Sequence, residues 1–90
     1  MTEQQIQTKI VRWCKENNLF VNKNISCSVN GWPDLVVIDP ADGHHLYIEV
    51  KDRYGRLSKI QEHIHKRLKI ANCEVITVRS LEEVKEYYEQ

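Results

Sequence analysis

Two short apolar segments joined by a turn constrain this chain more than any other feature of its sequence. Residues 34–39 and 45–51 have the composition of strands, and the Pro-Ala-Asp-Gly sequence at residues 40–43 is typical of a type I turn closed by glycine. Together they predict an antiparallel β-hairpin. The length of the turn sets a register in which Asp34 lies directly opposite Glu49.

Three segments begin with the sequence signature of a helix N-terminus. In each, a serine or threonine is followed three residues later by glutamine or glutamate, which is the pattern of a capping box. The pairs are Thr2 with Gln5, Ser58 with Gln61, and Ser80 with Glu83. The first helix is expected over about residues 3–17 and the second ends near residue 71. Apolar residues Ile60, Ile64 and Leu68 are expected to form the buried stripe of the second helix.

Two further strands complete the expected fold. Residues 19–29 alternate as a strand does, with a possible break at residues 22–24, and residues 74–78 form a short apolar run. The resulting order is αβββαβα. This order predicts an α/β domain in which a mixed sheet is flanked by helices, with residues 1–90 forming one domain.

Composition narrows the class of protein. The chain of 90 residues has 13 Lys and Arg against 13 Asp and Glu, a balance that argues against a polybasic surface. Its longest apolar run, residues 35–38, is far shorter than the ~20 residues of a membrane helix. A polar N-terminus resembles no targeting peptide, so a cytoplasmic protein is expected. Three cysteines suit neither a disulfide framework nor a zinc site.

The hairpin brings a set of chemically active side chains to one face of the expected sheet. Because side chains alternate along a strand, Glu49 and Lys51 share the face on which Asp34 lies. Carboxylates placed directly opposite repel each other, and a cation between them would remove the conflict. An oxygen-rich site of this kind suits Mg²⁺ or Mn²⁺, and a neighbouring lysine can stabilise charge on a phosphate.

A simpler interpretation of the same residues stays open at this point. Asp34 could cap the start of its strand, and Glu49 with Lys51 could form a solvated ion pair that contributes ~0–1 kcal/mol. His63 and His65 lie two residues apart on the second helix and diverge by ~200°, so they are not expected to share a metal.

Charge is unevenly distributed along the chain. Residues 51–69 hold seven Lys or Arg and two acidic residues, a local charge of +5, and the segments on either side are acidic. Arg53, Arg56 and Lys59 follow the second strand of the hairpin and lead into a helix N-terminus, so they are the expected contacts to a DNA backbone. A cationic helix that is merely solvated is the alternative.

Three segments in order carry a resemblance to a known family. They are Gly31-Trp32-Pro33-Asp34, Glu49-Val50-Lys51, and Gly55-Arg56-Leu57-Ser58 with Gln61. The chain resembles the VRR-NUC family (virus-type replication-repair nucleases) of the PD-(D/E)XK superfamily, in its stand-alone form. The chain departs from the usual family pattern at Asn18 and Asn72, where glycine commonly closes the first two helices.

The resemblance implies a set of residue roles in a Mg²⁺- or Mn²⁺-dependent endonuclease. Asp34, Glu49 and the main-chain carbonyl of Val50 would hold the metal, and Lys51 would be the catalytic lysine. Glu3 would reach the metal through water, unless it only favours the helix N-terminus. Gln61 would contact the attacking water or a phosphate, or else cap its helix, and one rotamer is not expected to serve both roles.

The resemblance also implies a substrate and a partner. Stand-alone members resemble Holliday junction resolvases, which implies a homodimer that cuts branched DNA in repair, in a bacterial cell or a phage-infected host. Trp13, Phe20, Trp32, Tyr87 and Tyr88 are the aromatic candidates for the dimer interface. Two alternatives stay open, namely a DNA-binding module that keeps the nuclease fold without catalysis and a plain interaction domain.

Overall fold

The computed structural model describes residues 1–90 and contains seven regular elements. In chain order they are α1 (Glu3–Glu16), β1 (Phe20–Lys23), β2 (Leu35–Ile38), β3 (His45–Val50), α2 (Lys59–Ile70), β4 (Glu74–Val78) and α3 (Leu81–Glu89). The predicted αβββαβα order is confirmed. The expected strand over residues 19–29 is wrong beyond residue 23, because the chain from 24 to 34 forms turns and irregular structure.

The strands form one four-stranded mixed sheet in the order β1-β2-β3-β4. β2 pairs antiparallel with both β1 and β3, and β3 pairs parallel with β4. Leu35 lies opposite Ile48 and Ile38 opposite His45, which is the register that the turn length predicted. Extended by one residue, this register carries Asp34 to the position opposite Glu49.

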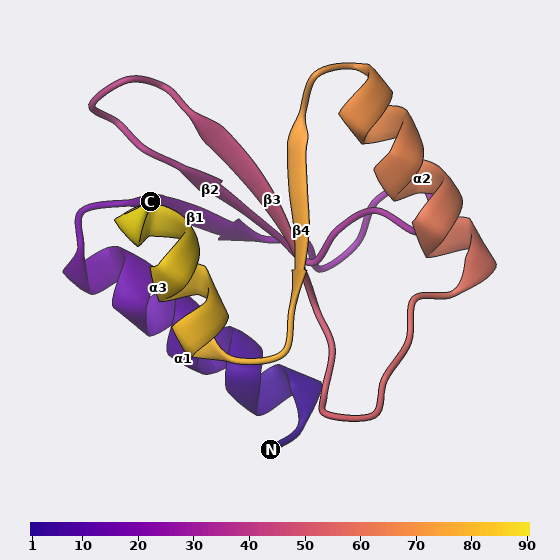
Figure 1. Ribbon diagram of the computed structural model, residues 1–90, viewed down its shortest axis with the longest axis horizontal. Coiled ribbons are helices and arrows are strands. Elements are labelled where there is room, and N and C mark those ends of the chain that lie inside the picture. The colour runs from indigo at the N-terminus through magenta and orange to yellow at the C-terminus, as the bar shows by residue number, and fades with distance from the viewer.

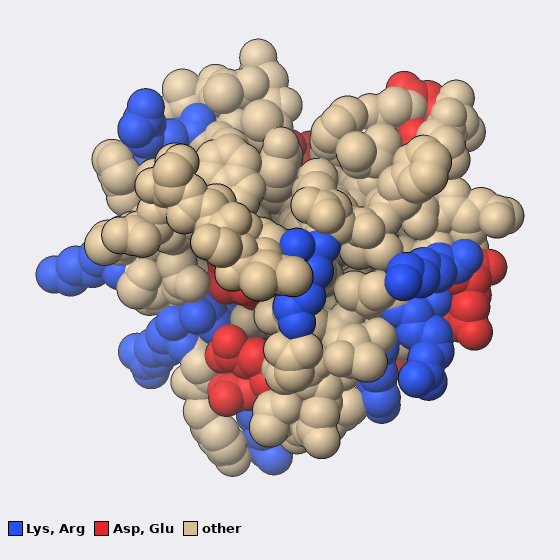
Figure 2. Space-filling view, turned by 180° about the vertical axis from the view of Figure 1, so that it is seen from behind, with Lys and Arg blue, Asp and Glu red and all other residues tan.

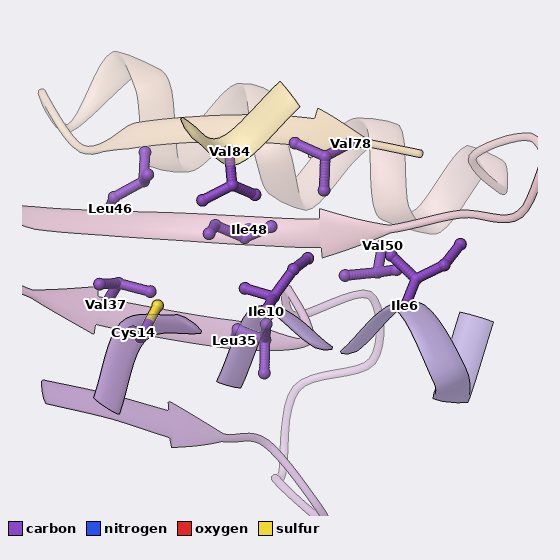
Figure 3. Close-up of a cluster of buried hydrophobic side chains, with 10 residues drawn as sticks. All are labelled: Ile6, Ile10, Cys14, Leu35, Val37, Leu46, Ile48, Val50, Val78 and Val84. Atoms are coloured by element: carbon purple, nitrogen blue, oxygen red, sulfur yellow. The ribbon is translucent and has the colours of Figure 1, made fainter. Parts of the chain in front are cut away.

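Helices cover both faces of the sheet (Figure 1). α1 and α3 pack on each other and on one face, and α2 lies on the opposite side, against β4. Figure 3 shows the apolar side chains of the first face meeting those of α1 and α3. This cluster contains ten buried residues: Ile6, Ile10, Cys14, Leu35, Val37, Leu46, Ile48, Val50, Val78 and Val84. Because side chains alternate along β3, Tyr47 and Glu49 point to the other face, toward α2.

Local interactions explain where the helices begin and end. Both predicted glutamine capping boxes form. The Thr2 hydroxyl accepts a hydrogen bond from the main-chain N–H of Gln5, and the Ser58 hydroxyl accepts one from the main-chain N–H of Gln61. Asn18 and Asn72 follow the ends of α1 and α2 with φ angles of 59° and 68°, which is the left-handed conformation that terminates helices. Asparagine therefore adopts, at these two positions, the helix-terminating conformation that glycine usually provides. No helix is long and apolar enough to cross a bilayer.

The packing of α2 differs from the expectation. Its only buried side chain is His65, whereas Ile60, assigned to the buried stripe, is 53% exposed. Ile64 and Leu68 are half-buried and line a shallow apolar groove that they share with Trp32. α2 is amphipathic, but its apolar stripe faces this groove and the solvent more than the sheet. The side chain of α2 that is buried against the sheet is the polar His65.

Candidate active site

The two carboxylates predicted to meet across the hairpin do lie together. Asp34 immediately precedes β2, and its Oδ2 accepts a hydrogen bond of 2.8 Å from the main-chain N–H of Val50. Glu49 lies in β3 and is 1% exposed. Because Asp34 is tied to the backbone beside Glu49, the geometry of the hairpin itself fixes the distance between the carboxylates.

Burial and the nearby carboxylate make Glu49 an unusual acid. Desolvation, followed by the hydrogen-bonding proximity and charge of Asp34, raises the pKa of Glu49 to about 8. The positive charge of Lys51 lowers the pKa of Glu49 and so partly offsets this rise. The Lys51 Nζ lies 4.0 Å from Glu49 Oε2, and the Lys51 side chain is 12% exposed. The interpretation of Glu49 and Lys51 as a solvated pair is therefore wrong, because both groups are withdrawn from water. Burial beside Asp34 therefore favours the protonated form of Glu49 when no cation is bound.

Gln61 both caps α2 and reaches the carboxylates. Its Oε1 accepts from the main-chain N–H of Ser58 at 2.9 Å, while its Nε2 donates to Glu49 Oε2 at 3.3 Å. One rotamer thus serves the cap and also reaches Glu49, whereas contact with the attacking water or a phosphate stays a prediction. The oxygen and the nitrogen of the amide diverge, so the oxygen closes the capping box and the nitrogen faces Glu49.

Glu3 reaches the same neighbourhood from the first turn of α1. A Cβ built on Gly55 would lie 3.1 Å from Glu3 Oε2 and 3.3 Å from Lys51 Cδ, so both side chains approach the loop that follows β3. The negative charge of Glu3 also contributes to the raised pKa of Glu49. Glycine at position 55 provides the space in which Glu3 and Lys51 come together.

The loop after β3 is held by hydrogen bonds from both sides. Asp52 Oδ1 accepts from the N–H groups of Tyr54 (2.9 Å) and Gly55 (2.6 Å), and the Asp52 carbonyl accepts from Arg79 Nη1 at 2.5 Å. At the start of the loop, the Lys51 N–H donates to the Val78 carbonyl at 3.0 Å. These bonds fix the path of the backbone that carries Lys51.

The predicted DNA contacts lie on this loop and on α2. Arg53, Arg56 and Lys59 are all exposed, and the Arg53 guanidinium lies 5.5 Å from the centre of the Tyr54 ring. Tyr54 is itself 81% exposed. Figure 2 shows basic side chains in separate groups with acidic side chains next to them, rather than one continuous basic face.

Sequence reasoning missed one residue of the site. His65 is 4% exposed, and its Nε2 lies 3.4 Å from Glu49 Oε1. Burial lowers the pKa of His65, which keeps the imidazole neutral. A signal was available, because His65 lies four residues after Gln61 and so shares its face of the helix. His63 is exposed on another face, in agreement with the predicted divergence.

The donor set of the site consists of oxygen atoms. No three His, Cys, Asp or Glu side chains are grouped so that they could hold a metal ion by themselves. The residues nonetheless fit a hard divalent cation, since half-buried Asp34 lies beside buried Glu49 and Glu49 Oε1 has no hydrogen-bond partner. Two carboxylates would need further oxygens from the main chain, water or a phosphate to complete six ligands.

Fold and site together define an α/β domain of the nuclease type. The VRR-NUC domain family matches residues 1–82. A solved structure described as a VRR_NUC domain superimposes with a TM-score of 0.85 at 26% identity, covering 100% of this chain and 98% of the other. A second, a VRR_NUC domain protein, gives a TM-score of 0.77 at 18% identity, covering 100% and 87%. No curated protein matches. The chain belongs to the VRR-NUC family.

Proposed function

We propose that this protein is a Mg²⁺- or Mn²⁺-dependent, structure-selective DNA endonuclease that hydrolyses phosphodiester bonds in branched DNA such as four-way junctions. The observation that carries the proposal is the pairing of Asp34 with buried Glu49 beside Lys51. A buried glutamate next to a second carboxylate destabilises a fold of this size unless the site has a use for it, such as binding a cation. We place this activity in the cytoplasm of a bacterial cell or of a phage-infected host, as the family resemblance implies.

The metal would be held by oxygen donors at the end of the hairpin. Asp34, Glu49 and the main-chain carbonyl of Val50 are the proposed ligands, with Glu3 acting through water. A divalent ion bound there would supply Lewis acidity toward the phosphate and lower the pKa of a coordinated water. The unpaired Glu49 Oε1 and the raised pKa of Glu49 support a site that favours a cation.

The remaining side chains would act on the substrate directly. The Lys51 ammonium lies beside Glu49, where it can offset the negative charge that develops on the phosphate in the transition state. The Gln61 amide already donates to Glu49, and in the complex it would orient the attacking water or a phosphate oxygen. Arg53, Arg56 and Lys59 would contact the DNA backbone on the approach to the site.

A homodimer would place two such sites on a branched substrate. Apolar side chains are unusually exposed around α2 and the β1–β2 connection: Ile25 (89%), Val29 (40%), Ile60 (53%) and Ile70 (73%). Among the five aromatic candidates for the interface, Phe20 is 66% exposed, whereas Trp13 packs on Tyr88 and Trp32 on Tyr47. Sedimentation equilibrium over a range of concentrations tests the dimer, and a monomer at micromolar concentration would contradict it.

Cleavage of labelled DNA tests the activity. Four-way junction, flap and linear duplex are incubated with the full chain in Mg²⁺, in Mn²⁺ and in chelator. We expect paired symmetric nicks in the junction, and a loss of at least about 100-fold in Asp34→Asn and Lys51→Ala. Asp34→Asn keeps an oxygen for the Val50 N–H, and Asp39→Asn at the other end of β2 is its matched control.

Other outcomes would assign a different function. Salt-sensitive junction binding without cleavage, unchanged by metal and by Glu49→Gln, would identify a non-catalytic DNA-binding module. Absence of DNA binding at low salt would favour an interaction domain instead.

A further inference from the structure

We propose that His65 is a positioning residue that holds the Glu49 carboxylate in the orientation needed to bind metal. The inference rests on the proposed function, because it assigns Glu49 a metal to bind. It adds to the site a residue that none of the sequence motifs contains.

The geometry around Glu49 carries the proposal. Its Oε2 faces Gln61 Nε2 at 3.3 Å and Lys51 Nζ at 4.0 Å. Its Oε1 faces His65 Nε2 at 3.4 Å. The carboxylate is therefore bracketed, with one oxygen directed to the amide and the ammonium and the other to the imidazole.

Two buried polar atoms face each other in this arrangement without a completed hydrogen bond. Glu49 Oε1 and His65 Nε2 are both buried and neither has a partner, although they are close to hydrogen-bonding distance. Buried polar groups are almost always paired, because an unpaired one has lost its hydrogen bonds to water without replacement. A small rotation of the imidazole, with its proton on Nε2, would satisfy both atoms and fix the rotation of the carboxylate.

The position of His65 on α2 suits this role better than a role in packing alone. His65 is the only buried residue of α2, although the same helix contains three isoleucines and a leucine. Gln61 and His65 are one turn apart and contact different oxygens of the same carboxylate. α2 therefore reaches into the site with two polar side chains, and both of them end at Glu49.

The experiment compares full-length variants at two neighbouring positions of one helix. His65→Phe keeps a ring but removes the nitrogen, His65→Gln retains an N–H donor, and His63→Phe is the matched exposed control. Mn²⁺ affinity is measured by electron paramagnetic resonance, and folding by urea titration in chelator. Loss of a residue that orients a metal ligand typically lowers metal affinity about 10- to 100-fold. We expect a loss of that size in His65→Phe, partial recovery in His65→Gln, and no change in His63→Phe.

A residue needed only for packing would behave differently. In that case folded His65→Phe would bind Mn²⁺ as tightly as the wild type and lose stability alone, which would overturn the proposal. Equal affinities in the Phe and Gln variants would also overturn it, because the donor would then be irrelevant.

A second measurement needs neither a His65 variant nor metal. The ¹⁵N and ¹H shifts of the His65 ring are recorded in chelator for the wild type and for Glu49→Gln. We expect a protonated Nε2 whose shifts change when Glu49 is replaced, and unchanged shifts would overturn the contact. If wild-type protein binds no Mn²⁺ while the ring shifts do respond to Glu49→Gln, the proposed nuclease function fails and the positioning contact stands.

Discussion

Glu49→Gln tests the electrostatic description of the site, because it removes the ionisable group and keeps the shape of the side chain. In metal-free protein, the pKa of Glu49 is raised from 4.5 to about 8. Between these values folded Glu49 holds a proton that the unfolded chain has released. The stabilising effect of that proton is complete below about pH 4.5 and is lost as the pH rises through about 8. The free energy of unfolding of the wild type therefore falls with rising pH in this window.

The size of the effect follows from the pKa. Each pH unit inside the window corresponds to about 1.4 kcal/mol for one proton, so the window of about 3.5 units gives an upper limit on the order of 5 kcal/mol. Relaxation of the site and entry of water at high pH reduce this value. We expect Glu49→Gln and the wild type to be equally stable near pH 5, and the variant to be more stable by about 2–3 kcal/mol near pH 8.5.

Urea unfolding in chelator, followed by tryptophan fluorescence at several pH values, measures the difference. Burial lowers the pKa of His65 in the wild type, so this residue adds a contribution that rises with pH and opposes that of Glu49. Exposed Glu86→Gln is the control for the change in charge. Mg²⁺ or Mn²⁺ at high pH is expected to restore the stability of the wild type and to leave Glu49→Gln unchanged. Parallel pH profiles for the wild type and Glu49→Gln would refute the reasoning.

Two glycines of the sequence motifs give further predictions. Gly31 has a φ of 88°, and an added Cβ would lie 2.7 Å from Ile60 Cγ2 and 2.9 Å from the Ile60 carbonyl oxygen. We therefore expect Gly31→Ala to lower the free energy of unfolding, measured in urea, by about 2–4 kcal/mol. Gly43→Ala, also at positive φ but in open space, should cost only about 1 kcal/mol, and equal costs would contradict the packing argument. Gly55→Ala crowds Glu3 and should lower junction cleavage at least about 10-fold with a stability loss near 1 kcal/mol. Full activity in a folded Gly55→Ala protein would show that Glu3 and its surroundings do not matter for catalysis.

The hairpin and the helix starts were predictable because both depend on short-range chemistry. A four-residue turn closed by glycine fixes the register, so the opposition of Asp34 and Glu49 followed from counting residues. Serine or threonine with glutamine three residues later is a local signal, and both such capping boxes form. These elements need no information about what packs against them.

The docking of α2 was not predictable in the same way. Apolar spacing identified a helix, but which face meets the sheet depends on the partner surface, and here that surface contains a buried carboxylate. His65 therefore occupies the position that a stripe of isoleucine and leucine was expected to fill. Gly31 and Ile60 are 29 residues apart in the chain, and nothing in the sequence near either residue predicts that they pack together. Burial of Glu49 has the same origin, because it is α2 that covers the acidic face.

The double use of Gln61 limits how this chain can vary. For capping alone, glutamate would serve as well as glutamine, and a negative charge in the first turn would be preferred. At position 61, however, glutamate would bring another carboxylate against Glu49 in place of the donor. Selection for a stable helix and selection for a working site thus favour different residues. A redesign guided by helix capping alone would exchange this glutamine for glutamate, and would improve the helix end while it damaged the site.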